Sequence, residues 1–307
     1  MIKTEHLCKR YNALVAVDDV SFEVRPGEVL GFLGPNGAGK TTTMRMLAGF
    51  VAPSSGRASV CGHDVERDAL AAKSCVGYLP EGAPLYGEMT VRRFLEFVAD
   101  LRGLEGERRA ARLAYVTDRL QLAPVLEQSI ETLSKGFRRR VGLAQAIMHD
   151  PPVLILDEPT DGLDPNQKHE VRTLINEMAR EKIVIISTHI LEEVDAVCNR
   201  AIIISRGRIV ADDSPHGLAA KSRYHNAVSI RLERTEQLPA VRAALAALPS
   251  VAEVEVSDRE SRLTALPRAG RTILPAVSEL AARQGFALKE LHLESGRLDE
   301  VFRTITA

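Results

Sequence analysis

A glycine-rich stretch at residues 34–42 constrains this chain more than any other part of it. It fits the pattern Gly-x-x-x-x-Gly-Lys-Thr and follows an apolar segment; its residues are Gly34, Pro35, Asn36, Gly37, Ala38, Gly39, Lys40, Thr41 and Thr42. A helical pattern begins at residue 42, and glycines let backbone N–H groups face an anion at the helix N-terminus. The sequence therefore predicts a phosphate-binding loop, in which Lys40 reaches the outer phosphates and the Thr41 hydroxyl binds Mg²⁺.

Length and composition suit a globular protein of about two domains. The chain has 307 residues, of which 45% are hydrophobic, and a formal net charge of -1. Because nucleic-acid binding relies on clustered Lys and Arg, this balance argues against a dedicated nucleic-acid binder. The 4 cysteines are widely spaced and indicate neither a zinc site nor a disulfide framework. The longest aliphatic runs have the length of a strand, so we do not expect the chain to cross a membrane by itself.

Apolar segments and helical patterns alternate along the first 218 residues. Residues 1–87 are rich in predicted strands, and residues 88–150 are mostly helical. Apolar strands then return, separated by two helical stretches; the strands are predicted at 153–156, 183–186 and 201–204 and the helices at 166–180 and 190–197. Such alternation predicts an α/β fold with a parallel sheet covered by helices.

Two adjacent acids end one of these strands. Asp157 and Glu158 directly follow the aliphatic run at 153–156. One carboxylate in such a place can hold Mg²⁺, and a second can orient and deprotonate a water that attacks a terminal phosphate. We assign the first role to Asp157 and the second to Glu158. The alternative is a solvated acidic turn, which the phosphate-binding loop makes the weaker interpretation.

A third motif narrows the choice among proteins with such a loop. Leu133-Ser134-Lys135-Gly136-Phe137 precedes a helical stretch, and Asp161-Gly162-Leu163-Asp164 and Ser187-Thr188-His189 follow the acid pair. In this order the motifs resemble those of the ATP-binding subunits of ABC transporters, over residues 1–218. The chain looks most like the ATPases of drug, polysaccharide or gliding-motility exporters. The resemblance implies a P-loop NTPase core with a strand-rich subdomain and a helical subdomain at about 88–150.

The resemblance also implies that a single chain does not hold a complete site. A head-to-tail homodimer or heterodimer would enclose two ATP molecules, with Ser134 and Gly136 of one chain donating to the γ-phosphate held by the other. Asp164 would connect the two sites. The dimer would power a separate integral membrane permease, and the chain would be cytoplasmic, held at the cytoplasmic face of the membrane through that permease.

Two further site residues come from the resemblance alone. His189 would contact the γ-phosphate and position Glu158 or the attacking water; by itself, a histidine there is more often an ordinary strand-end residue. Tyr11 lies where the family has an aromatic side chain that stacks on adenine, and the alternative is packing within a strand. Lys40, Glu158 and His189 form the expected catalytic set, which acts on ATP with Mg²⁺.

The chain departs from the family pattern in two places. Glu81 follows Tyr-Leu-Pro where the family commonly has Gln, so it either binds Mg²⁺ as a carboxylate or faces solvent. Lys135 and Phe137 replace Gly and Gln in the third motif, and Lys135 either adds a cation near the partner's phosphates or points to water. The run at 138–140 is Arg-Arg-Arg; because these side chains fan out around a helix, we expect a solvated surface.

Residues 219–307 lie outside this catalytic pattern. Their order is βαββαβ, with strands predicted at 228–232, 251–256, 262–266 and 286–293 and helices at 238–248 and 273–283. This is the split pattern of a ferredoxin-like α+β domain. A last helix starts at Leu298. The sequence leaves the role of this accessory domain open among dimer contact, regulation and structural capping.

The leading hypothesis is a Mg²⁺-dependent transport ATPase. The alternative is a soluble ABC-type ATPase acting on a non-transport partner such as ribosomes or DNA. Such relatives usually carry two nucleotide domains in one chain or a long coiled-coil insertion. A non-hydrolysing regulatory subunit is disfavoured because Lys40, Asp157, Glu158 and His189 are all present.

Overall fold

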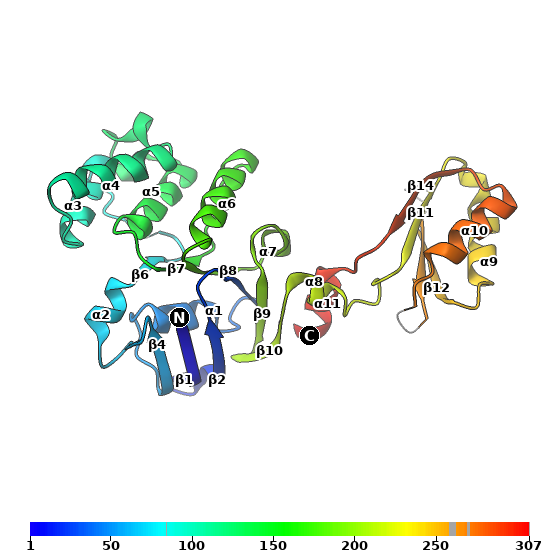
Figure 1. The fold of residues 1–307 in the computed structure, drawn as a ribbon, viewed down its shortest axis with the longest axis horizontal. Coiled ribbons are helices and arrows are strands. Elements are labelled where there is room, and N and C mark those ends of the chain that lie inside the picture. Colours follow the sequence, from blue (N-terminus) through cyan, green and yellow to red (C-terminus); the bar gives the residue numbers. More distant parts are fainter. Residues whose placement is uncertain (84, 258–261, 269–270, 307) are drawn as a thin grey trace. The chain divides into compact units, whose positions relative to one another are not determined.

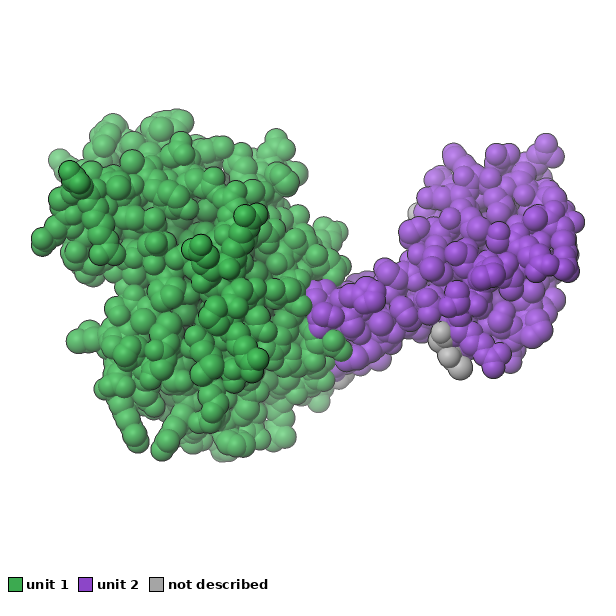
Figure 2. All heavy atoms as spheres, viewed as in Figure 1, with its two compact units in different colours: residues 1–213, 306 green, residues 214–305, 307 purple. Residues whose placement is uncertain are grey.

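The computed structural model describes residues 1–83, 85–257, 262–268 and 271–306. The chain divides into two compact units, residues 1–213 with Thr306 and residues 214–305 (Figure 2). The division falls after Asp213, whereas the sequence led us to expect a boundary after residue 218. Each unit has its own apolar core.

The first unit contains two sheets (Figure 1). The smaller sheet is antiparallel in the order β2-β1-β4-β5, with β1 at Ile2–Tyr11, β2 at Leu14–Val24, β4 at Ser55–Val60 and β5 at His63–Asp64. The larger sheet has the order β10-β9-β3-β8-β7-β6, with β3 at Val29–Leu33, β6 at Val76–Leu79, β7 at Val153–Asp157, β8 at Ile183–Thr188, β9 at Arg200–Ser205 and β10 at Arg208–Asp213. Its strands pair in parallel except for β10, which confirms the predicted parallel sheet.

Apolar cores cover both faces of the larger sheet. The strands β3, β7 and β8 are buried along their whole length, because alternate side chains enter opposite cores. Leu154 and Leu156 pack with the core of the helical layer, and Ile155 packs with the core that includes α1 and the smaller sheet. The predicted helical subdomain is confirmed as the layer of α3, α4 and α5 (Figure 1).

The helices of the first unit are short or of medium length. They are α1 (Lys40–Leu47), α2 (Ala69–Ser74), α3 (Val91–Leu101), α4 (Gly106–Arg119), α5 (Lys135–Ile147), α6 (Pro165–Ala179) and α7 (Leu191–Val197). Single 3₁₀ turns occur at Ala123–Val125 and Ile130–Thr132. In the described part of the chain, we find no helix with both the length and the apolar character that crossing a bilayer requires.

The order of the parallel strands brings the predicted motifs together. Strand β8 lies between β3 and β7, so the carboxyl ends of these three strands meet at one edge of the sheet. The phosphate-binding loop leaves β3, the acid pair ends β7, and His189 follows β8. Ligands of open α/β sheets bind at this edge.

The second unit is a ferredoxin-like α+β domain, as predicted. Its antiparallel sheet has the order β12-β13-β11-β14, with β11 at Val228–Leu232, β12 at Val251–Ser257, β13 at Arg262–Pro267 and β14 at Leu288–Leu293. Its helices are α8 (Pro215–Ala219), α9 (Leu238–Ala246), α10 (Leu274–Gln284) and α11 (Leu298–Thr306), with a 3₁₀ turn at Thr235–Gln237. The core forms where α9 and α10 pack on one face of the sheet.

Candidate nucleotide-binding and active site

The phosphate-binding loop needs its glycines for space as well as for conformation. A Cβ atom on Gly34 would lie 2.4 Å from the carbonyl oxygen of Ile204, and one on Gly39 would lie 2.5 Å from that of Ala16. Gly39 also has a φ of 109°, in the left-handed region that favours glycine. In the described structure no side chain caps the start of α1 at Lys40, so its first N–H groups face the loop. This arrangement fits an anion such as a phosphate.

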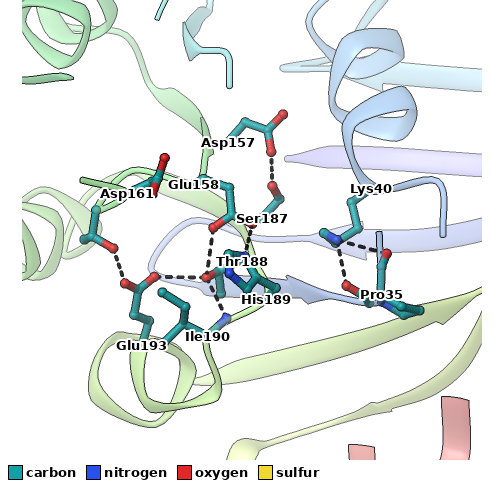
Figure 3. Close-up of polar contacts among 12 residues, drawn as sticks. Pro35, Lys40, Asp157, Glu158, Asp161, Ser187, Thr188, His189, Ile190 and Glu193 are labelled. Carbon is teal, nitrogen blue, oxygen red and sulfur yellow. Dashed lines mark hydrogen bonds and ion pairs between the residues drawn. The ribbon is translucent and has the colours of Figure 1, made fainter. Parts of the chain in front are cut away.

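Lys40 lies against the loop that it would serve. Its Nζ donates to the carbonyl oxygens of Gly34 at 2.6 Å and Pro35 at 3.2 Å (Figure 3). Burial lowers the pKa of the Lys40 ammonium, and the negative charge of Glu158 opposes that shift. The lysine is therefore already held at the loop, with the charge that an outer phosphate needs.

One pocket gathers most of the predicted residues. It is lined by Tyr11, Leu14, Ala16, Asn36, Gly37, Gly39, Lys40, Thr41, Thr42, Glu81, Asp157 and Glu158. Tyr11 is 44% exposed, so its ring is not a core residue, and Leu14 lies opposite it in the β1–β2 pairing. Leu14 and Ala16 could not be predicted as site residues, because an apolar residue after a turn is typical of any strand. Glu81 is exposed and lines the pocket.

Asp157 has the surroundings of a metal ligand. Its side chain is 1% exposed, and Oδ1 accepts a hydrogen bond from the Ser187 hydroxyl (Figure 3). Among the described residues, its buried Oδ2 has no hydrogen-bond partner. A buried carboxylate oxygen without a partner is costly, and a hard cation such as Mg²⁺ would satisfy it. Thr41, from the loop, lines the same pocket.

Glu158 and His189 form a pair at the same edge. Nδ1 of His189 lies 2.8 Å from Oε1 of Glu158, and the Thr188 hydroxyl oxygen lies 3.4 Å from Oε2. The backbone of Glu158 has a φ of 53°, an uncommon value for a residue other than glycine. The structure therefore brings Glu158 and His189 into contact, as predicted.

A second buried acid stands behind this pair, and the sequence reading missed it. Glu193 on α7 is 4% exposed and accepts hydrogen bonds from the hydroxyls of Thr160 and, at 3.0 Å, Thr188 (Figure 3). Lys168 lies 3.9 Å from the same carboxylate. Glu193 therefore links the turn after the acid pair to the end of β8. Its position in a short polar helix resembles that of any surface acid, so the sequence carried no usable signal.

The prediction of a solvated surface for Arg138–Arg140 was wrong for two of the three side chains. Arg139 and Arg140 are each 5% exposed, and only Arg138 is exposed. Arg139 donates to the carbonyl oxygens of Pro80, at 3.0 Å, and of Asp157 and Glu158. Helix α5 packs against neighbours on more than one side, so adjacent positions both turn inward. The sequence pattern shows directions around a helix but not which of them are covered.

The third motif stands at the start of α5. Ser134 is exposed and caps this helix, accepting a hydrogen bond from the Phe137 N–H at 3.3 Å. Lys135 forms an ion pair with Asp161 at 2.8 Å, and its side chain is 67% exposed. This contact lowers the pKa of the Asp161 carboxyl.

Asp164 and Gly136, which were predicted to act at the site of a partner chain, also have contacts within their own chain. Asp164 caps α6 and accepts from the Gln167 N–H at 2.9 Å. Gly136 is buried, and a Cβ there would lie 2.8 Å from Oε1 of Gln167. The described residues that line the pocket do not include Ser134, Gly136 or Asp164. Within one chain the structure therefore does not bring these residues to the phosphate-binding loop.

Fold and site together define the class of protein. A glycine-rich loop between β3 and α1, an acid pair at the end of β7 and a helical layer that carries the third motif are the features of a P-loop nucleotide-binding domain of the ABC type.

Comparisons with known proteins agree. The family described as "ABC transporter" matches residues 17–161. The Nod factor export ATP-binding protein I of Ralstonia nicotianae is 34% identical over 308 residues, covering 100% of this chain and 94% of that protein. The chain belongs to the family of ABC transporter ATP-binding proteins, as the sequence predicted.

Other matches cover about 72% of this chain. The probable multidrug ABC transporter ATP-binding protein YbhF of Escherichia coli is 35% identical over 223 residues, covering 72% of this chain and 38% of that protein's length. A solved structure described as the ATP-binding subunit of an ABC transporter superimposes with a TM-score of 0.68 and 29% identity, over 72% of this chain and 92% of the other. These matches confirm the predicted fold class.

Proposed function

We propose that this protein binds and hydrolyses ATP with Mg²⁺ as the ATP-binding subunit of an ABC transporter. The observation that carries the proposal is the Glu158 carboxylate, which lies 2.8 Å from His189 and lines one pocket with the phosphate-binding loop. A carboxylate so placed can accept a proton from a water beside a terminal phosphate. Membership of the family supports the same activity.

Binding would fall to residues that line the pocket. Lys40 and the N–H groups at the start of α1 would hold the phosphates, and the exposed ring of Tyr11 would stack on the base. Thr41, Asp157 and Glu81 are the residues that would hold Mg²⁺. When bound, Mg²⁺ supplies positive charge that offsets the charge of the phosphates.

Hydrolysis would depend on the pair at the end of β7 and β8. Glu158 would orient the attacking water and take its proton. His189 contacts one oxygen of the Glu158 carboxylate at 2.8 Å, which would orient the base. His189 is the more exposed of the two and is free to contact the terminal phosphate.

The substitution Glu158→Gln tests this proposal. The amide keeps the shape of the side chain but cannot accept the proton, so turnover should fall by about a hundredfold or more while ATP affinity is retained. ATPase rate and ATP binding are measured on the same preparation. Glu192→Gln, an exposed acid on α7, is the matched control and should behave as wild type. Turnover that survives Glu158→Gln would contradict the assignment.

A second chain would complete each site. Ser134 stands exposed at the N-terminus of α5, where an anion is favoured, yet it does not line the pocket that holds Lys40. We infer that Ser134 and Gly136 reach the γ-phosphate held by a partner chain, and that Asp164 lies where the two sites meet. The partner would be a second copy of this chain or a homologous chain, since either supplies the same motif.

The permease would dock on an exposed apolar groove of the first unit. Its lining residues are Phe50, Tyr78, Pro80, Leu85, Tyr86, Phe94, Phe97, Val98, Leu101, Arg102 and Gln145. Leu101 is 70% exposed and Phe50 and Tyr86 are also exposed, which is unusual for a patch that stays in water. Pro80 connects the groove to Glu81 in the site.

The substitution Leu101→Glu tests this docking face. The variant should no longer copurify with the permease but should still bind ATP; unchanged copurification would contradict this docking face.

The relatives support an export role. One is named for Nod factor export and another for multidrug transport. We therefore propose an exporter, with the chain held at the cytoplasmic face of the membrane through its permease.

A further inference from the structure

Arg139 makes an unusual set of contacts for a helical side chain. It lies on α5, which begins beside Ser134, and is 5% exposed. Its guanidinium donates to the carbonyl oxygen of Pro80 at 3.0 Å and to those of Asp157 and Glu158. One side chain of the helical layer thus binds the backbone of two loops that line the pocket.

These acceptors belong to the peptide units that carry the site's carboxylates. Pro80 directly precedes Glu81, and the other two acceptors are the carbonyl groups of the acid pair itself. Glu158 has a φ of 53°, which costs free energy in a residue other than glycine. A guanidinium bound to its carbonyl holds the peptide in that conformation.

The charge of Arg139 suits this place. Burial lowers the pKa of the guanidinium, whereas the carboxylates of Asp161, Asp157 and Glu158 oppose that shift. An arginine keeps its charge and offers a planar fork of N–H groups, so it can serve several carbonyl oxygens at once. A lysine offers a point charge, and a glutamine offers two N–H groups without charge.

We propose that Arg139 is a positioning residue, which fixes the acid pair and the start of the Glu81 loop relative to α5 and thereby sets the rate of hydrolysis. The role in hydrolysis rests on the proposed function. The fixing of the two loops does not depend on it, because it concerns contacts within this chain.

Arg112, a half-buried arginine on α4, provides a control for an arginine that binds backbone carbonyl groups. Its guanidinium donates to the carbonyl oxygens of Ile147, at 2.6 Å, and Met148, at 2.9 Å, at the other end of α5. These acceptors carry none of the site residues. Arg112→Gln therefore removes an anchor that α4 provides for the end of α5, without touching the acid pair.

The test compares Arg139→Gln and Arg139→Lys with Arg112→Gln. We measure kcat, ATP affinity, urea unfolding, and amide hydrogen exchange at the non-proline residues of 81–83 and 157–161. Arg139→Gln should lower kcat about tenfold or more while ATP affinity changes less than about threefold, because the base is displaced but the phosphate loop is not. Amide exchange should quicken in both segments. The kcat and exchange rates of Arg139→Lys should lie between those of Arg139→Gln and wild type.

Arg112→Gln should lower stability but leave kcat and exchange in both segments at wild-type values. If Arg139→Gln does not fold, Arg139→Lys carries the same comparison. Unchanged exchange at 81–83 and 157–161 would overturn the proposal, as would an equal loss of kcat in Arg112→Gln. If the wild-type protein shows no hydrolysis, the proposed function fails, and the exchange contrast alone then decides the positioning role.

Discussion

Asp157 and Glu158 are adjacent in the chain but have different surroundings. Asp157 is buried, with one oxygen bonded to Ser187 and the other without a partner among the described residues. Glu158 instead faces His189 and the pocket. The first arrangement suits a cation and the second suits a base, so we propose separate roles for the two carboxylates.

Glu81 offers a test at the same scale, because a carboxylate replaces the uncharged amide of the family. It lines the pocket with Asp157 and Glu158. A third carboxylate attracts Mg²⁺ but repels a phosphate when the metal is absent. Glu81→Gln should therefore move the midpoint of the ATPase rate against Mg²⁺ concentration upward and leave a similar plateau. Superimposable curves for wild type and variant would remove Glu81 from the metal site.

The sequence predicted the acids of this site but not what holds them. Asp157, Glu158 and His189 stand in recognisable motifs, so their roles could be predicted from order and context. Glu193 and Arg139 could not, because burial decides what an acid or an arginine on a helix does. Sequence patterns show the direction of a side chain around its helix, whereas packing determines whether that direction is solvent or core.

At the scale of elements, the predicted strands and helices agree with the structure in both units. The strand at 153–156 is β7, and the tail has the predicted βαββαβ order. The order of the strands in the sheet could not be predicted in the same way. That β8 lies between β3 and β7 follows from crossover connections, which local patterns do not encode.

His149, two residues after the end of α5, should make the stability of the fold depend on pH. Burial lowers the pKa of the His149 imidazole to about 4, and the nearby charge of Arg102 adds to the effect. The unfolded chain has an ordinary histidine pKa of about 6.5, so between these values it binds more protons than the folded chain. The contribution of His149 to the free energy of unfolding should be fully present above pH 6.5 and should be lost as the pH falls toward 4.

His149→Gln should reduce this slope, since glutamine does not titrate. Urea midpoints between pH 4.5 and 7 are measured for wild type, His149→Gln and the exposed-histidine control His169→Gln. The control should keep the wild-type slope. Equal slopes for all three proteins would show that His149 does not contribute to it.

For the molecule as a whole, the two units should be separable. The cores around the larger sheet lie within residues 1–213, and the core of the ferredoxin-like domain lies within residues 214–305. A chain that ends near Pro215 should therefore keep a cooperative thermal transition and its ATP affinity. Loss of the folded first unit on truncation would contradict separate domains.

The central claim is that two chains complement each other at each ATP site, and mixing two inactive variants tests it most directly. Lys40→Ala removes the lysine of the phosphate-binding loop. Ser134→Asp keeps the cap of α5, because aspartate is a good N-cap, but adds a negative charge toward the partner's phosphate.

Each variant alone should be inactive, because both sites of its dimer carry the defect. In a mixed dimer, one site combines the intact loop of one chain with the intact third motif of the other. An equimolar mixture should then recover about a quarter of the wild-type ATPase rate, since half of the dimers are mixed and each has one intact site. A mixture that forms mixed dimers by native mass spectrometry but stays inactive would contradict the account, and so would full activity of Ser134→Asp alone.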